Sequence, residues 1–149
     1  MKIILTDSTN VDYVRLTEQL DEELESIYGE MQKKYHPLNQ SQPLNQVVLI
    51  YLDHRAVACG AYKELTEESA ELKRIFVLPD VRGRGISKRI VQELETDAQK
   101  NGYREIYLET GSKQQTAVAL YKSCGYELTE NYGPYVGDTN SICMKKTIK

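Results

Sequence analysis

Apolar residues recur along the chain at two spacings, one typical of helices and the other of strands. Between Val11 and Met31, leucine and isoleucine return at three- and four-residue steps with carboxylates between them, which predicts an amphipathic helix. The same helical spacing predicts two more helices, over residues 85–100 and 113–123. Asn101 and Gly102 supply a C-terminal stop for the first of these two.

Shorter apolar or alternating runs predict seven strands, which cover residues 2–8, 46–52, 56–65, 69–78, 105–110, 126–129 and 141–147. In the fourth strand, alternation places Leu72, Arg74, Phe76 and Leu78 on one face and Glu71, Lys73, Ile75 and Val77 on the other. A helix joins the strands at 69–78 and 105–110. A right-handed crossover is therefore expected, with these two strands parallel. The pattern predicts one domain over 1–149, of α/β or α+β class, with a mixed sheet.

Composition narrows the class of protein. The chain has 149 residues, 40% of them hydrophobic, which is enough for one core without disulfides or metals. A net charge of −3 argues against a nucleic-acid partner. No signal peptide or membrane span is recognisable, and the three cysteines form no CxxC pair, so a reducing cytoplasmic location and no metal are expected.

The most informative segment follows the fourth strand, where Pro79 is followed by Arg82-Gly83-Arg84-Gly85 and a helix begins. Glycines let backbone N–H groups approach an anion, and a helix N-terminus leaves donors unsatisfied and carries partial positive charge. Arginines and lysines surround this point in an otherwise acidic chain. The segment therefore favours a pyrophosphate site, although a plain strand-to-helix turn stays an alternative. It lacks the Gly-Lys-Ser/Thr of a Walker A loop and the GxGxxG of a dinucleotide fold.

At these residues the chain resembles the GNAT superfamily of acyl-CoA N-acyltransferases. The family signature Gln/Arg-x-x-Gly-x-Gly/Ala is similar to residues 82–87, RGRGIS, in which Ser87 takes the last position. A second family block, Asn-x-x-Ala-x-x-Leu-Tyr-x-x-x-Gly-Phe/Tyr, is similar to residues 114–126, with Gln114 in place of Asn. The resemblance is firm from about Glu71 to Tyr126.

The resemblance implies a mixed, mostly antiparallel central sheet with flanking helices and a splayed parallel strand pair. Acetyl-CoA is implied as cosubstrate, with its pantetheine along the end of the fourth strand and its pyrophosphate on the glycine loop. The implied cofactor-binding residues are Ile75, Phe76, Val77, Leu78, Arg82, Gly83, Arg84, Gly85, Ile86, Ser87, Lys88 and Gln114.

Acetyl transfer to an amine needs a base for the ammonium proton and an acid for the departing thiolate. Glu71 matches the position of the base in several family members, and pairing with a neighbouring cation is the alternative. Tyr121 lies where the family places a tyrosine near the thioester sulfur, with a core role as the alternative. Glu109, at the end of the fifth strand, is a second candidate for the base or for binding a cationic amine, with a capping or loop-ordering role as the alternative.

Two loops are expected to form the walls of the acceptor site. The segment 130–137, rich in Tyr, Gly and Asn, contributes Asn131, Tyr132 and Tyr135, and the proline-containing segment 36–45 contributes Asn39. The sequence predicts an N-acetyltransferase for a primary amine of a small molecule or peptide. A CoA-binding sensor without activity is the alternative, and a nucleotide-binding protein unrelated to CoA is disfavoured by the paired motifs. A homodimer is left open, and no membrane partner is expected.

Overall fold

The computed structural model describes residues 1–29, 44 and 46–148. It contains seven strands, three helices and two short 3-10 turns in the described part of the chain. The strands are β1 (Lys2–Thr6), β2 (Gln46–Leu52), β3 (Arg55–Thr66), β4 (Ser69–Val77), β5 (Glu105–Gly111), β6 (Glu127–Thr129) and β7 (Ser141–Thr147). The helices are α1 (Val11–Tyr28), α3 (Ile86–Lys100) and α4 (Gln115–Ser123), and the turns are η1 (Pro79–Val81) and η2 (Gly133–Tyr135).

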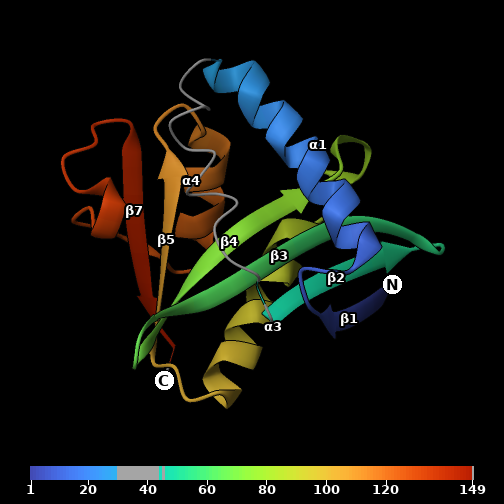
Figure 1. Ribbon diagram of the computed structural model, residues 1–149, viewed down its shortest axis with the longest axis horizontal. Coiled ribbons are helices and arrows are strands. Elements are labelled where there is room, and N and C mark those ends of the chain that lie inside the picture. Colours follow the sequence, from blue (N-terminus) through green and yellow to red (C-terminus); the bar gives the residue numbers. More distant parts are fainter. Residues whose placement is uncertain (30–43, 45, 149) are drawn as a thin grey trace.

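All seven strands form one sheet in the order β1-β2-β3-β4-β5-β7-β6 (Figure 1). Every neighbouring pair is antiparallel except β4 and β5, which are joined through α3 and run parallel. These two strands pair only over Ser69–Glu71 and Glu105–Tyr107, and beyond that point they separate. The mixed, mostly antiparallel sheet with a splayed parallel pair is confirmed.

Helices cover both faces of the sheet (Figure 1). In this view α1 crosses in front of β3 and β4, whereas α3 lies behind β2, β3 and β4. Each helix buries the apolar stripe that the sequence predicts: Leu16 and Leu20 in α1, and Ile90 and Leu94 in α3. The opening between β4 and β5 is therefore bounded by helices on both sides.

The predicted face pattern of β4 is wrong past Lys73. The register pairs Lys73 with Ala61 and Phe76 with Cys59, so two residues of β4 lie opposite one residue of β3. Arg74 takes a φ of +59° at this bulge. One extra residue reverses the alternation, so Phe76 lies on the face of Glu71 and Lys73 and Val77 lies on the opposite face.

The element boundaries differ from the predictions by a few residues. The first helix ends at Tyr28, where Gly29 takes a positive φ of 56° and its N–H donates to Glu25 O. The last helix begins at Gln115, since the backbone of Gln114 is not helical (φ −99°, ψ 61°) and its side chain makes no capping hydrogen bond. In the described part of the chain, no helix is both long and apolar enough to cross a membrane.

Candidate active site

Two cavities open where β4 and β5 separate. A small one, of about 140 Å³, lies deep between the strands under the C-terminal half of α1. A longer cleft, of about 570 Å³, runs from the end of β4 along the glycine loop to the start of α4. We call them the inner pocket and the outer cleft. Both are lined by Leu20, Ile75, Gln114, Ala117 and Tyr121.

The glycine loop forms one end of the outer cleft, at the start of α3. Gly83 and Gly85 have φ of +81° and +79°, a conformation that glycine adopts without the steric cost of a Cβ. No described side chain caps the N-terminus of α3, and Ile86, Ser87 and Lys88 line the cleft there. Unsatisfied N–H groups at a helix start attract an anion, so this end of the cleft fits a pyrophosphate.

The three loop residues Leu78, Arg82 and Arg84 differ in how the structure uses them. Arg82 lines the cleft, but its guanidinium forms an ion pair with Glu23 at 2.9 Å and donates to Val77 O at 2.9 Å. Arg84 is exposed and lines neither cavity. The N–H of Leu78 donates to β3, at Val57 O, rather than facing the gap. A direct role of these residues in cofactor binding stays a prediction.

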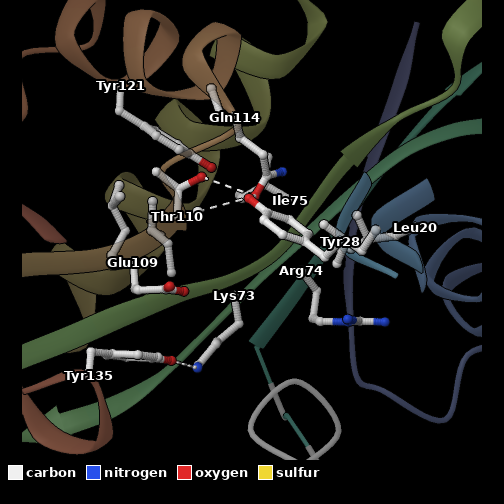
Figure 2. A pocket seen from close by; sticks show the side chains of 15 residues that line it. Leu20, Tyr28, Lys73, Arg74, Ile75, Glu109, Thr110, Gln114, Tyr121 and Tyr135 are labelled. Carbon is white, nitrogen blue, oxygen red and sulfur yellow. Dashed lines mark hydrogen bonds between the residues drawn. The ribbon is translucent and has the colours of Figure 1, made fainter. Parts of the chain in front are cut away.

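Gln114 lies at the junction of the two cavities and orders the turn between β5 and α4 (Figure 2). Its Oε1 accepts from Gly111 N at 3.2 Å and Thr110 Oγ1 at 3.4 Å, and also from Tyr28 Oη at 3.2 Å. A Cβ at Gly111 would overlap the Tyr28 hydroxyl, so a larger residue here would displace the Tyr28 side chain from this position. In this position Tyr28 closes one side of the inner pocket.

Glu109 places a carboxylate in the inner pocket (Figure 2). Its Oε2 accepts a hydrogen bond from Ser141 Oγ at 2.8 Å. Burial raises the pKa of this carboxyl, a shift that the hydrogen bond from Ser141 and the charge of Lys73 oppose but do not cancel. A carboxyl with a raised pKa inside a cavity is suited to accept a proton near neutral pH.

Glu71 lies deeper than Glu109 and lines neither cavity. Its side chain is 4% exposed, and its Oε2 accepts from Tyr132 Oη at 2.6 Å. Two ammonium groups approach its Oε1, Lys73 at 3.4 Å and Lys63 at 3.8 Å. Since Glu71 and Lys73 lie two residues apart on one strand face, this pairing follows from the pleat of β4.

Tyr121 forms part of the wall that the two cavities share (Figure 2). The residue is buried, and burial raises the pKa of its hydroxyl, so the proton stays on the oxygen at neutral pH. The charges of Cys124 and Glu109 act in the same direction. A protonated hydroxyl at this junction can donate to a group that enters from either side.

The loop before β7 contributes Tyr132 and Tyr135 in different ways. Tyr135 lines the inner pocket, and its hydroxyl accepts from Lys73 Nζ at 3.0 Å. Tyr132 lies behind it, ring against ring at 5.6 Å, and reaches Glu71 instead. Asn131 donates to the carbonyls of Tyr135 and Asp138 within the loop and lines neither cavity. Asn39 lies outside the described residues.

Three site residues were missed by the sequence reasoning. Lys73 and Tyr28 line the inner pocket, and Lys113 lines the outer cleft beside Gln114. Lys73 had a signal, because it shares a strand face with Glu71; Tyr28 had none, because its role depends on a contact with residues far along the chain. Within the described residues, no group of three or more His, Cys, Asp or Glu could hold a metal ion.

The chain is also similar to known proteins. The model of the "Acetyltransferase (GNAT) family" matches residues 13–126. The chain is 33% identical over 137 residues to an IAA acetyltransferase of Azospirillum brasilense, an alignment that covers 91% of this chain and 90% of that protein.

Solved structures share the fold. A crystal structure from Klebsiella pneumoniae, assigned to the acyl-CoA N-acyltransferases, has a TM-score of 0.84 at 28% identity and covers 99% of this chain and 97% of its own. An aminoglycoside 6'-N-acetyltransferase in complex with coenzyme A has a TM-score of 0.70 at 20% identity, with coverage of 100% and 98%.

Proposed function

Because the chain belongs to the acetyltransferase (GNAT) family, we propose that it transfers the acetyl group of acetyl-CoA to a primary amine of a small molecule or peptide. The protein is an N-acetyltransferase, and acetyl-CoA is its cosubstrate. What remains to be proposed is the acceptor and the residues that carry the reaction. For those roles we assign Glu109 as the base and Tyr121 as the acid.

One observation carries this assignment: the inner pocket and the outer cleft share a wall that includes Tyr121. The outer cleft has the glycine loop and the uncapped helix start at one end, which suits the phosphates of coenzyme A. The inner pocket has a carboxylate and is too small for a nucleotide. Two reactants that enter these spaces meet beside the Tyr121 hydroxyl.

The proposed steps use groups already in place. Glu109 takes a proton from the ammonium form of the acceptor, which leaves a nitrogen lone pair. That nitrogen attacks the thioester carbonyl, a C–N bond forms, and the C–S bond breaks. Tyr121 gives its proton to the departing thiolate and regains one from solvent or from the new amide nitrogen. Burial raises the pKa of Glu109, which supports its role as a base near neutral pH, and the raised pKa of Tyr121 keeps its hydroxyl protonated until the thiolate departs.

Access to the inner pocket favours Glu109 over Glu71 as the base. Glu71 accepts a hydrogen bond from Tyr132, pairs with two lysines and lines neither cavity. Its charge therefore holds other side chains in place. A base must reach the proton it removes, directly or through one water. Glu109 meets that condition for anything bound in the inner pocket.

The test is release of free thiol from acetyl-CoA across a panel of primary amines, with acetylated product identified by mass. We expect thiol release that depends on one class of amine and that falls in Glu109→Gln. Binding of acetyl-CoA with no thiol release for any amine would favour the CoA-binding sensor instead.

A further inference from the structure

The charges that reach the inner pocket limit which acceptors it can hold. Its charged lining residues are Lys73, Arg74 and Glu109. Nη2 of Arg74 donates to Thr17 O at 3.1 Å and lies 3.0 Å from Asp21 on α1, whereas Nη1 is buried with no hydrogen-bond partner among the described residues. Among the described residues, the cationic groups of Lys73 and Arg74 and the carboxyl of Glu109 can therefore meet a bound molecule, and Lys73 lies nearest the acidic side of the pocket, beside Glu71.

The charge of Lys73 is only partly compensated by its neighbours. Its side chain is 12% exposed, and its ammonium donates to Tyr135 and lies 3.4 Å from Glu71. Glu71 is shared with a second ammonium, that of Lys63 at 3.8 Å. One carboxylate thus faces two lysines, and at least one of the three N–H donors of Lys73 stays available to the pocket.

Glu109 does not neutralise the charge of Lys73 during the reaction. Its carboxyl becomes neutral when it takes the proton of the acceptor amine. At that stage the cluster of Glu71, Lys63 and Lys73 carries a net positive charge beside the attacking nitrogen. A second ammonium on the acceptor would be repelled there, whereas an anionic group would be bound.

We propose that the acceptor is a small primary amine with a carboxylate close to the amine, as in an amino acid, and that Lys73 binds this carboxylate. The proposal rests on the proposed function, since it places the amine toward Glu109 and Tyr121. Tyr135 acts as a positioning residue, because its hydroxyl holds the ammonium of Lys73 at the pocket wall. The volume of about 140 Å³ keeps the amine and the carboxylate within a few bonds of each other.

This proposal narrows the expectation that Glu109 could bind a cationic amine, because it adds a carboxylate to that amine. The sequence shows Glu71 and Glu109 but not their partners. In the structure Glu71 pairs with two lysines, and the carboxyl of Glu109 shares the pocket with the ammonium of Lys73. Polyamines and aminoglycosides are accordingly expected to be poor acceptors.

The experiment compares acceptors that differ only in the carboxylate. Each L-amino acid is assayed beside its C-terminal amide and its decarboxylated amine, with spermidine and an aminoglycoside as polycations. For the best side chain we expect kcat/KM to be at least about tenfold higher for the acid than for the amide, which corresponds to ~1.4 kcal/mol. Equal or better activity with the amide, the amine or a polycation overturns the proposal.

Variants separate the role of Lys73 from general damage. Lys73→Met keeps the length of the side chain, and we expect the preference for acid over amide to fall to within about threefold. Lys63→Met removes the other ammonium near Glu71 from outside the pocket lining; Glu71 then faces one lysine, so the preference should fall, but by less than in Lys73→Met. An unchanged preference in Lys73→Met overturns the proposal. The ratio in the wild-type protein is decisive even if that variant does not fold.

The outcomes also separate this proposal from the proposed function. Acetylation of amides or polycations in preference to acids leaves the acetyltransferase intact and removes only the carboxylate recognition. Absence of thiol release with every amine, in a protein that still binds acetyl-CoA, overturns both.

Discussion

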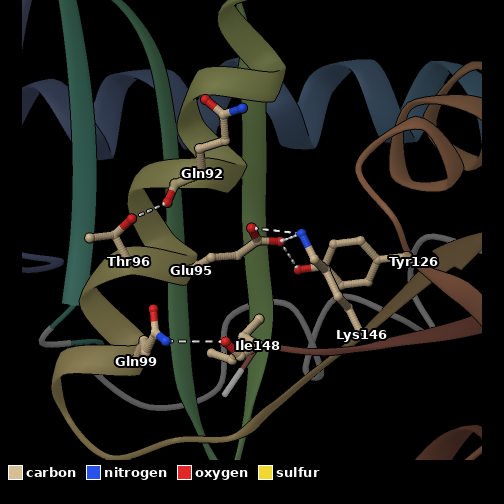
Figure 3. A network of polar contacts seen from close by, with 7 residues as sticks. All are labelled: Gln92, Glu95, Thr96, Gln99, Tyr126, Lys146 and Ile148. Atoms are coloured by element: carbon tan, nitrogen blue, oxygen red, sulfur yellow. Dashed lines mark hydrogen bonds and ion pairs between the residues drawn. The ribbon is translucent and has the colours of Figure 1, made fainter.

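Two clusters of the same chemical composition lie on opposite sides of β5 and have different roles. Around Glu95 of α3, Lys146 Nζ donates to both carboxylate oxygens at 3.0 and 3.2 Å, and Tyr126 Oη donates to Oε2 at 2.8 Å (Figure 3). Around Glu109, the neighbouring lysine and tyrosine bond to each other instead, and the carboxylate accepts from Ser141. A carboxylate, a lysine and a tyrosine therefore define neither a structural nor a catalytic cluster by themselves.

The clusters around Glu95 and Glu109 differ in whether the carboxylate oxygens already have partners and whether the residue lines a cavity. Glu95 lines neither the inner pocket nor the outer cleft, and its bonds fasten α3 to β7. Glu109 lines the inner pocket with spare acceptor capacity. Glu71 is similar to Glu95 in this respect, because its carboxylate already interacts with a tyrosine and two lysines. We expect substitutions at these three carboxylates to have effects of different kinds.

Glu109→Gln should have the largest effect. Loss of a general base lowers kcat by about 10²- to 10⁴-fold. The base acts only when ionised, and burial raises the pKa of Glu109, so the acidic limb of the wild-type pH profile should lie above the ordinary carboxyl value of about 4.3. The variant should lose this limb and recover part of its rate at high pH, where free amine appears unaided. A rate unchanged at every pH would remove Glu109 from the base role.

Tyr121→Phe should lower kcat by about ten- to a hundredfold, or ~1.4–2.7 kcal/mol, and leave acetyl-CoA affinity nearly intact. The ring keeps its packing, and only the proton donor to the thiolate is lost. Tyr126→Phe is the matched control, because Tyr126 packs edge to face against Tyr121 at 6.0 Å but bonds to Glu95. Steady-state rates and cofactor titration on both variants decide the matter. Equal rates in the two variants would show that Tyr121 contributes packing and not the proton.

Glu71→Gln should have a smaller effect, with a loss of less than about tenfold in kcat/KM. Gln still accepts from Tyr132, but without the carboxylate charge it holds Lys73 less firmly. The loss should be the same at every pH because no proton is taken up. A selective loss at low pH, reversed at high pH, would instead identify Glu71 as the base.

Glu95→Gln should leave kcat unchanged and reduce stability. One charge-assisted hydrogen-bond set is weakened, which costs about 1.5 kcal/mol and lowers the melting temperature by roughly 3–6 °C. Thermal unfolding beside the rate assay measures both. A fall in kcat at full stability would show that the two clusters are not separate in function.

Local sequence determined most of the fold. Apolar repeats at helical and strand spacing predicted the helices and all seven strands to within a few residues, because each element must bury one stripe or face. The glycine loop was recognisable for the same local reason. Positive φ at Gly83 and Gly85 and an uncapped helix start are properties of a short segment, and the sequence encodes them directly.

The bulge in β4 was not predictable in this way. Arg74 adopts a positive φ that its own residue type does not favour. Its guanidinium is held by Thr17 O and Asp21 of α1, which are distant in sequence, so tertiary contacts override the local preference. The alternation of β4 beyond this point therefore required the structure.

The roles of the carboxylates were decided only by tertiary structure. The sequence singled out Glu71 and Glu109 as the acidic pair, and nothing local distinguishes a base from a structural anchor. Tyr132 and Lys63 interact with the carboxylate of Glu71, whereas in the described part of the chain Glu109 accepts only from Ser141 and still lines the inner pocket. These partners come from other strands and loops. Burial and hydrogen-bond partners set the pKa and the access of a carboxyl, and both depend on where the folded chain places residues that are far apart in sequence.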